Sequence, residues 1–258
     1  MSKLAFITGA SSGLGQALAR RYHLAGYQLA LVGRRAAQIE TWAGRQGFKT
    51  GSYCIYSADV AQADSIVAAG LACLDAQGVP DVVLACAGMS IGVDTGQRTD
   101  LDVMARTFAT NNLGTAATFH PFLAAMKTRG NGTLVGMGSV NAVRGFAGHG
   151  ANCPSKAAMV NYLECLRLEL RASGVKVVTI CPGYVATPLT QANQFSMPFL
   201  LQPEEFAERA WAAIEAQVSY RVIPWQMGVV AKALRVLPNW VFDRAFAGRA
   251  RKPRATGT

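Results

Sequence analysis

The stretch Thr8-Gly9-Ala10-Ser11-Ser12-Gly13-Leu14-Gly15 decides the fold, because it joins an apolar run to an amphipathic segment. Residues 4–7 predict a short buried strand, and residues 13–26 predict a helix with an apolar face of Leu14, Ala17, Leu18 and Leu24. The three glycines permit a tight turn with room beside the backbone. Free N–H groups at the helix start favour an anion. We predict a phosphate-binding turn, although strand-to-helix turns also use glycine for steric reasons alone.

The composition is typical of an α/β domain with a large core. The chain has 258 residues, of which 51% are hydrophobic and 26 are glycine. Six cysteines lie in apolar segments without a C-x-x-C pair, so we expect core thiols in a reducing compartment, the cytoplasm. Three dispersed histidines predict no metal site. We see no cleavable leader and no apolar run of membrane-spanning length.

The positive charge is concentrated near the C-terminus. Residues 219–258 hold eight basic residues and one acidic residue, within a total net charge of +10. Residues 1–218 hold 17 basic and 14 acidic residues, so the body is nearly balanced. This distribution argues against nucleic-acid binding by the whole protein.

Apolar runs alternate with helical patterns along the chain. Strands are predicted at 4–7, 28–32, 52–58, 81–86, 132–137, 176–181 and 220–223. Helices are predicted at 13–26, 36–46, 62–77, 99–128 with an interruption near 111–114, 152–173 and 203–217. The alternation predicts a doubly wound, mostly parallel sheet of seven strands with helices on both faces. Ligands bind such sheets at the carboxyl ends of the strands.

The motifs, in order, are T-G-x-x-x-G-x-G, Asp59, Ala87-Gly88, Asn111, Ser139, Lys156 and Pro182-Gly183. This series resembles the short-chain dehydrogenase/reductase family over roughly residues 3–225. The resemblance implies a Rossmann-type fold that binds a nicotinamide dinucleotide and transfers a hydride between the cofactor and a carbonyl or alcohol. We accordingly divide the chain into a dinucleotide-binding and catalytic domain, 1–225, and a basic amphipathic extension, 226–258.

The resemblance also implies the cofactor site. Its residues would be Gly9, Ser11, Ser12, Gly13, Leu14, Gly15, Asp59, Val60, Cys86, Ala87, Gly88, Lys156, Pro182, Gly183, Val185 and Thr187. Asp59 and Val60 would contact adenine, and Gly88 would lie against the adenosine ribose. Cys86 stands where the family usually has asparagine, which costs one polar contact.

Charge at the end of the second predicted strand indicates which dinucleotide binds. An acid about twenty residues beyond the glycine turn would bind the ribose 2′-hydroxyl of NAD. Here Arg34 and Arg35 occupy that place, and two guanidiniums suit a 2′-phosphate. The alternative is two solvated arginines opening a helix, where their charge opposes the dipole. We predict NADP(H).

The catalytic set departs from the family pattern at one position. Ser139 and Lys156 fit the family's serine and Tyr-x-x-x-Lys spacing, but Asn152 holds the tyrosine position. Residues 152 and 156 are one helical turn apart, so both side chains face the same way. An amide donates a hydrogen bond but does not exchange a proton at neutral pH. By resemblance, Ser139 would orient the carbonyl, Lys156 would hold the nicotinamide ribose, and Asn111 would support the lysine through water.

Three explanations for Asn152 stand side by side. It is an engineered substitution, a natural feature of a weakened or non-catalytic relative, or a position for which another acid substitutes. The candidate substitutes are His149 and Tyr184, each of which also reads as an ordinary loop residue. We expect an NADP(H)-dependent oxidoreductase impaired at Asn152. The alternative is a non-catalytic NADP(H)-binding relative that acts through protein or membrane contacts.

Two segments bear on substrate and partners. Residues 184–202 carry Phe195, Met197, Phe199, Leu200 and Leu201, which form either an apolar lid over a mildly apolar carbonyl substrate or ordinary packing against the domain.

In the tail, apolar residues recur at helical spacing at 227, 230, 231, 234 and 237, with Lys232 and Arg235 off that stripe. Such a helix either docks on its own protein or lies on an anionic membrane. Relatives commonly form dimers or tetramers through two long helices, here 99–128 and 152–173.

Overall fold

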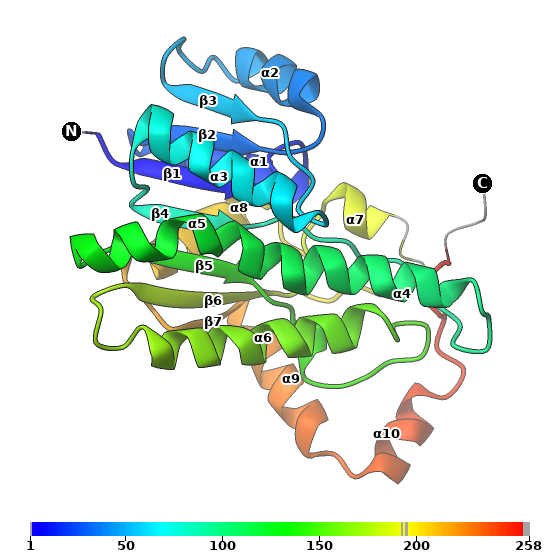
Figure 1. The fold of residues 1–258 in the computed structure, drawn as a ribbon. Coiled ribbons are helices and arrows are strands. Elements are labelled where there is room, and N and C mark those ends of the chain that lie inside the picture. The colour runs from blue at the N-terminus through cyan, green and yellow to red at the C-terminus, as the bar shows by residue number, and fades with distance from the viewer. Residues whose placement is uncertain (1, 192, 194–195, 255–258) are drawn as a thin grey trace.

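The computed structural model describes residues 2–191, 193 and 196–254. Within this part of the chain seven strands form one sheet in the order β3-β2-β1-β4-β5-β6-β7, and all of their pairings are parallel (Figure 1). The strands are β1 Leu4–Thr8, β2 Gln28–Val32, β3 Tyr53–Tyr56, β4 Val82–Ala85, β5 Thr133–Met137, β6 Lys176–Pro182 and β7 Tyr220–Ile223. The predicted Rossmann-type, doubly wound sheet is confirmed.

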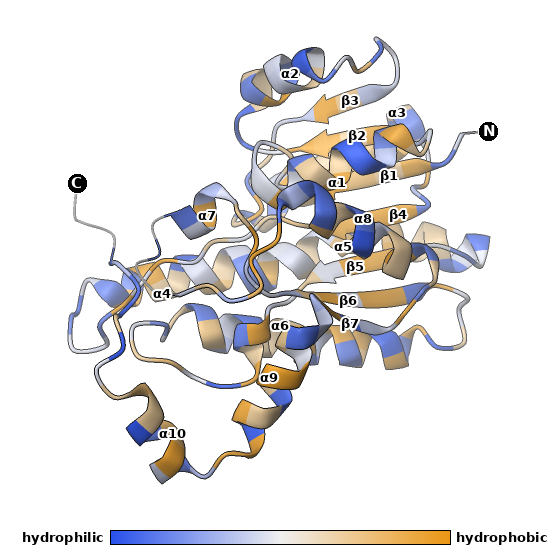
Figure 2. Ribbon diagram, turned by 180° about the vertical axis from the view of Figure 1, so that it is seen from behind, coloured by the Kyte–Doolittle hydropathy of each residue, from blue (hydrophilic) through white to orange (hydrophobic). Residues whose placement is uncertain are grey.

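Helices cover both faces of this sheet and bury an apolar core on each. One core contains side chains of α1 (Gly13–Leu24), α2 (Ala36–Arg45) and α8 (Pro203–Glu215). The other contains side chains of α3 (Ala63–Gln77), α5 (Gly114–Arg129) and α6 (Asn152–Glu169). Successive residues of β1 alternate between the two, with Ala5 and Ile7 in the first core and Leu4 and Phe6 in the second. Burial on both faces explains why central strands such as β1 and β4 are almost entirely apolar (Figure 2).

The long helical region is interrupted where the sequence predicts. Helix α4 (Asp100–Phe108) leads into a π-helical turn, η1 (Ala109–Leu113), and then into α5. The Thr115 hydroxyl donates to the Asn111 carbonyl at 2.8 Å. Such π-helical turns frequently occur at functional sites.

Beyond β7 the chain forms two helices, α9 (Trp225–Val236) and α10 (Asn239–Phe246), which we call the C-terminal helix pair. The pair lies below β7 in Figure 1. Arg144 holds its corner, because its guanidinium donates to the carbonyls of Leu234 and Leu237 at 2.7 and 2.6 Å. It also donates to the Asn239 Oδ1 at 2.8 Å. One side chain thus satisfies carbonyls at the end of α9 and fixes the start of α10.

Residues 247–254, which we call the terminal segment, return to the loop after β4. The Gly92 N–H donates to the Pro253 carbonyl at 2.9 Å. Arg254 donates to both carboxylate oxygens of Asp100, at 2.6 and 2.8 Å. The tail therefore packs on the Rossmann body. Two shorter helical elements complete the fold, the 3-10 turn η2 (Val140–Ala142) and α7 (Pro188–Gln191).

Some burial predictions are wrong. Leu24 is exposed, because it is the last residue of α1. Cys54 and Cys165 are exposed rather than in the core, since Cys54 lies on the edge strand β3 and Cys165 on the outer side of α6. Among the described residues, no helix combines the length and apolarity needed to span a membrane.

Candidate functional site

The glycine-rich turn leaves no room for side chains at two of its positions. Gly9 has φ +71°, and a Cβ there would lie 2.9 Å from the Ala87 Cα. A Cβ on Gly15 would collide with the carbonyl oxygen of Gly9. Gly13, with φ +54°, opens α1, whose first turn carries no acidic residue. The turn is therefore a cradle of backbone at the positive end of a helix, which fits a dinucleotide pyrophosphate.

Thr8 fastens this turn to the end of β4. Its buried hydroxyl accepts hydrogen bonds from the backbone N–H groups of Cys86 and Ala87, at 3.1 and 3.2 Å. It also donates to the Leu84 carbonyl at 3.4 Å. Cys86 replaces the family's asparagine at this turn, and burial raises the pKa of its thiol to about 12. The threonine holds the backbone here, so the turn keeps its shape without the asparagine amide.

Of the two arginines after β2, Arg35 contacts the glycine-rich turn and Arg34 contacts Asp59. The Arg35 Nη2 donates to the Ser11 Oγ at 3.1 Å, which brings its guanidinium to the glycine-rich stretch. Arg34 is exposed, and its Nη1 lies 3.6 Å from the Asp59 Oδ2. The same Asp59 carboxylate accepts a hydrogen bond from the Ala61 N–H at 3.0 Å. Two cations and one carboxylate therefore surround this corner of the predicted site.

Lys156 and Asn111 meet beside Gly88. The Lys156 Nζ donates to the Met137 carbonyl at 2.7 Å, and burial lowers the pKa of this lysine to about 8. A Cβ on Gly88 would lie 3.3 Å from the Asn111 Oδ1 and 3.7 Å from the Lys156 Nζ. The structure thus brings the predicted lysine, asparagine and glycine together at the carboxyl edge of the sheet.

The buried Asn111 side chain is held from three sides. Its Oδ1 accepts from the Met89 N–H at 2.9 Å, and its Nδ2 donates to the Met89 carbonyl at 3.1 Å. The same Nδ2 donates to the Ser155 Oγ at 2.9 Å. The Ser155 hydroxyl in turn donates to the Asn152 carbonyl at 2.8 Å. This chain of bonds connects η1 to the first turn of α6.

Ser139 and Asn152 lie at the ends of two neighbouring elements. Ser139 follows β5, and its Oγ accepts from the Asn141 N–H at 3.1 Å. Asn152 is buried at the first position of α6, one turn before Lys156. The loop between them, residues 143–151, contains His149.

The remaining predicted cofactor residues lie around the ends of β1, β3 and β6. A Cβ on Gly13 would lie 3.5 Å from the Thr187 Cγ2, so the segment after β6 covers the glycine-rich turn. Gly183 follows β6, and a Cβ there would lie 2.8 Å from the Met227 Cγ. The others are Ser12, which precedes α1, Leu14 on its first turn, Val60 after β3, Pro182 at the end of β6, and Val185, which is buried in a core.

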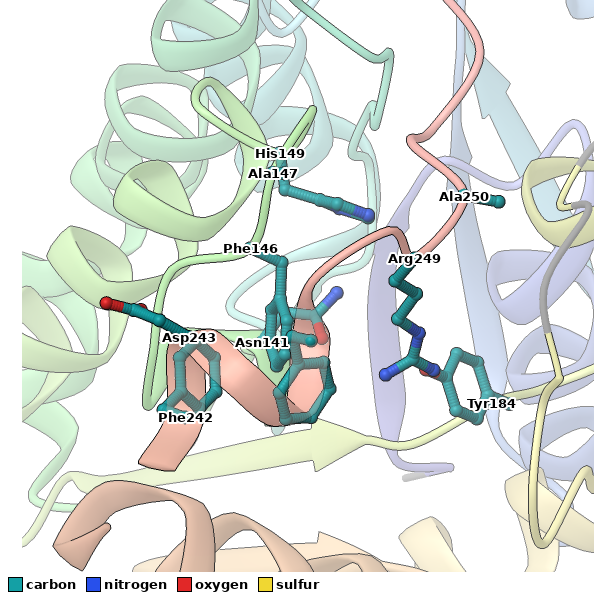
Figure 3. Close-up of a pocket in the computed structure, with 10 residues that line it drawn as sticks. Asn141, Phe146, Ala147, His149, Tyr184, Phe242, Asp243, Arg249 and Ala250 are labelled. Atoms are coloured by element: carbon teal, nitrogen blue, oxygen red, sulfur yellow. The ribbon is translucent and has the colours of Figure 1, made fainter. Parts of the chain in front are cut away.

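A pocket of about 230 Å³ opens between the 141–149 loop and the tail (Figure 3). Its walls are Asn141, Phe146, Ala147, His149, Tyr184, Phe242, Asp243, Phe246, Arg249 and Ala250. Sequence reasoning missed it. The aromatic residues of 240–246 are visible in the sequence, but nothing there connects them to Phe146, almost a hundred residues earlier.

His149 and Tyr184, the two possible substitute acids, both line this pocket. Burial, together with the charges of Lys252 and Arg249, lowers the pKa of His149 to about 4. Burial raises the pKa of Tyr184. At neutral pH both side chains are therefore held in their neutral forms.

Among the described residues of the segment 184–202, some pack on the domain and others are exposed. Leu201 is buried and its backbone bridges to Val185, whereas Phe199 and Leu200 are exposed. Met197 accepts a hydrogen bond from the Asn193 amide at 3.5 Å to its sulfur. Phe195 lies outside the described residues. The apolar lid remains a prediction.

A parallel seven-stranded sheet with helices on both faces and a glycine-rich turn after β1 defines the class of Rossmann-type proteins. The chain belongs to the short chain dehydrogenase family, which it matches over residues 3–196, and is an oxidoreductase of that family.

Relatives extend the likeness over most of the chain. It is 36% identical over 247 residues to an uncharacterized oxidoreductase of Myxococcus xanthus, covering 94% of this chain and 96% of that protein. It is 31% identical to the dehydrogenase/reductase SDR family member 7B of Bos taurus, covering 96% and 81%. An alcohol dehydrogenase of Thermococcus sibiricus, solved with 5-hydroxy-NADP, superposes with a TM-score of 0.78 at 26% identity, covering 86% and 96%.

Proposed function

We propose that this protein is an NADP(H)-dependent oxidoreductase acting on a carbonyl or alcohol of mildly apolar character. The observation that carries the proposal is that the glycine-rich turn packs on Ala87, while the next residue, Gly88, lies beside the Lys156 amine. When bound, a nicotinamide dinucleotide supplies the hydride chemistry. The chain's own residues bind and orient the two reactants there.

The choice of NADP(H) rests on the arginines after β2. Arg35 already reaches Ser11, and a 2′-phosphate would replace that neutral partner with a charged one. Asp59 pairs loosely with exposed Arg34, so this guanidinium is available to an anion. The Thermococcus relative was solved with an NADP derivative. These observations favour NADP(H) over NAD(H).

The cofactor preference has a direct test. We expect tighter binding of NADPH than of NADH by calorimetry. Replacing both residues, Arg34→Ala with Arg35→Ala, should weaken NADPH binding about tenfold or more and leave NADH nearly unchanged. Arg45→Ala, at the other end of α2, is the matched control. Tighter NADH binding by the parent protein would contradict this part of the proposal.

We assign the positioning of the substrate to Ser139. We assign proton transfer to no residue, because none of the candidates has a pKa suited to it at neutral pH. Ser139 donates a hydrogen bond to the substrate carbonyl and orients it. Lys156 holds the nicotinamide ribose, and Asn111 supports Lys156. Asn152 offers only an amide hydrogen bond. His149 has a pKa of about 4, so its protonated form is scarce at neutral pH, and the raised pKa of Tyr184 makes it a weak acid. We therefore expect slow turnover with cofactor binding intact.

Restoring the phenol tests this assignment. In Asn152→Tyr, oxidation of NADPH over a panel of carbonyl compounds should rise by about 10²–10⁴-fold, the usual contribution of a positioned acid. NADPH binding should be unchanged. Asn161→Tyr, at an exposed position of the same helix, is the control and should have no effect. Equal rates for the parent and Asn152→Tyr would refute our reading of the site.

The comparison of the parent with Asn152→Tyr also tests the second candidate function, NADP(H) binding without catalysis. The presence of Asn152 at the tyrosine position favours this function. A protein that binds NADP(H) without catalysis would show no NADPH oxidation in either form and would act through protein or membrane contacts.

A homodimer or homotetramer through α4–α5 and α6, and a cytoplasmic location, stay predictions. Two exposed leucines, Leu113 at the end of η1 and Leu168 on α6, support the oligomer.

A further inference from the structure

One face of α9 is apolar and exposed. Trp225, Val229 and Val236 are 65%, 59% and 80% exposed. Their spacing, together with Lys232, places all four on one side of the helix. Met227, on the other side, is buried against the body. The stripe expected from the sequence, with Met227 and Ala231 buried, is therefore the inner one, and the exposed apolar residues of α9 form a second, outer stripe that was not expected.

Helix α10 also has two distinct faces. Phe242 and Phe246 face inward, with ring centroids 5.6 and 5.3 Å from that of Phe146. Trp240 is 74% exposed, and Arg244 follows one turn later on the same outer side. The inner face lines the pocket, and the outer face carries an aromatic residue beside a cation.

Arg144 contacts both helices of the C-terminal helix pair. Besides its hydrogen bonds to α9 and the start of α10, its guanidinium lies 4.0 Å from the centroid of the Phe242 ring. The Arg235 Nη1 donates to the Val143 carbonyl at 3.3 Å. The C-terminal helix pair is therefore held on the body, and the side of each helix away from the body stays exposed.

The charge on this surface decides between possible occupants. The outer sides of the two helices carry two exposed cations, Lys232 and Arg244. The one acid of residues 219–247, Asp243, lines the pocket, and the other two basic residues are Arg221 on β7 and Arg235, which is bonded to the Val143 carbonyl. In a two-fold dimer through this face, basic residues would lie against basic residues. A surface of anionic headgroups over hydrocarbon complements both the charges and the tryptophans.

We propose that the outer face of the C-terminal helix pair, formed by Trp225, Val229, Lys232, Val236, Trp240 and Arg244, docks on an anionic lipid surface. The tryptophan rings enter the headgroup level and the valines reach the acyl boundary. The cations pair with lipid phosphates. Because the inner face of α10 lines the pocket, docking brings the pocket wall next to the lipid. On the proposed function, this position gives an apolar carbonyl compound a short path from the lipid.

The test is flotation of the full-length protein with vesicles. The protein should float with vesicles of phosphatidylcholine and phosphatidylglycerol, and about tenfold less with phosphatidylcholine alone or at high salt. Trp225→Ser with Trp240→Ser should weaken flotation about tenfold or more, and Lys232→Glu with Arg244→Glu should do the same. Leu24→Ser, an exposed apolar residue on α1, is the matched control and should float like the parent. Circular dichroism and NADPH binding show that each variant is folded.

Three results would overturn the proposal. The first is no flotation of the parent at low salt. The second is flotation that the tryptophan variant leaves unchanged. The third is a soluble dimer that the tryptophan variant dissociates, which would assign this face to a second copy of the chain. None of these results depends on hydride transfer, so the proposal fails or stands apart from the proposed enzymatic activity.

Discussion

At the scale of single residues, Lys156 carries the sharpest electrostatic consequence. On the proposed function this lysine holds the nicotinamide ribose, and burial lowers its pKa to about 8. In the unfolded chain the pKa returns to about 10.4. Between these values the unfolded state binds more protons, so the contribution of Lys156 to folding stability becomes more favourable as the pH rises. Below about pH 8 the folded protein carries the full cost of a buried ammonium.

This sign yields a prediction for Lys156→Met. The free energy of unfolding of the parent minus that of the variant should increase between about pH 8 and pH 10. Urea titrations of both proteins at several pH values measure it. Taking the difference between the two proteins removes the titration of tyrosines and cysteines, which both share. A flat difference would show that the lysine has an ordinary pKa.

At the scale of elements, the terminal segment is attached to the first residue of α4, Asp100, by hydrogen bonds. Its Arg254 pairs with Asp100, whose carboxylate also accepts from the Asp94 N–H at 2.6 Å. The hydrogen bonds from Arg254 hold the pKa of Asp100 below its usual range. This contribution is present above the unfolded pKa, about 3.9, and is lost as the pH falls through the lower folded value.

Asp100→Asn should therefore lower Tm at neutral pH, and the gap to the parent should close as the pH falls below about 4. Thermal unfolding followed by circular dichroism across this range measures it. Asp102→Asn is the control on the same helix, because its carboxylate is largely exposed and pairs loosely with Arg98. An equal decrease in Tm for both variants at neutral pH would show that the Arg254–Asp100 pair stabilises the fold no more than an exposed ion pair does.

At the scale of the whole molecule, the exposed leucines of the long helices predict self-association. Leu168 on α6 is 61% exposed, and burying it against a second copy would remove apolar surface from water. We expect light scattering to give the mass of a dimer or tetramer and Leu168→Arg to shift it toward the monomer. Leu24→Arg on α1 should leave the mass unchanged. A monomeric parent protein would contradict the prediction.

Much of this architecture could be predicted from the sequence, because its signals are local. Apolar strands buried on both faces, and glycines that admit no Cβ, are visible in short stretches such as 4–15. The interruption in the long helix also lay where Asn111-Asn112 suggested. The pocket could not be predicted, since Phe146, Phe242 and Phe246 meet only through tertiary packing. Val230 was expected on the inner stripe of α9, but the helix meets the body along a narrower strip that leaves it partly exposed.

The pocket has a further consequence for how the polypeptide matures. Its first wall, at 141–149, precedes its second wall, at 242–250, by almost a hundred residues. A chain cut after Ile223 would retain all seven strands and every residue assigned to the dinucleotide, but only half of the pocket. During synthesis, the residues proposed to bind the cofactor are therefore complete well before the second wall of the pocket. A premature stop in this interval would leave a chain that keeps those residues and lacks that wall.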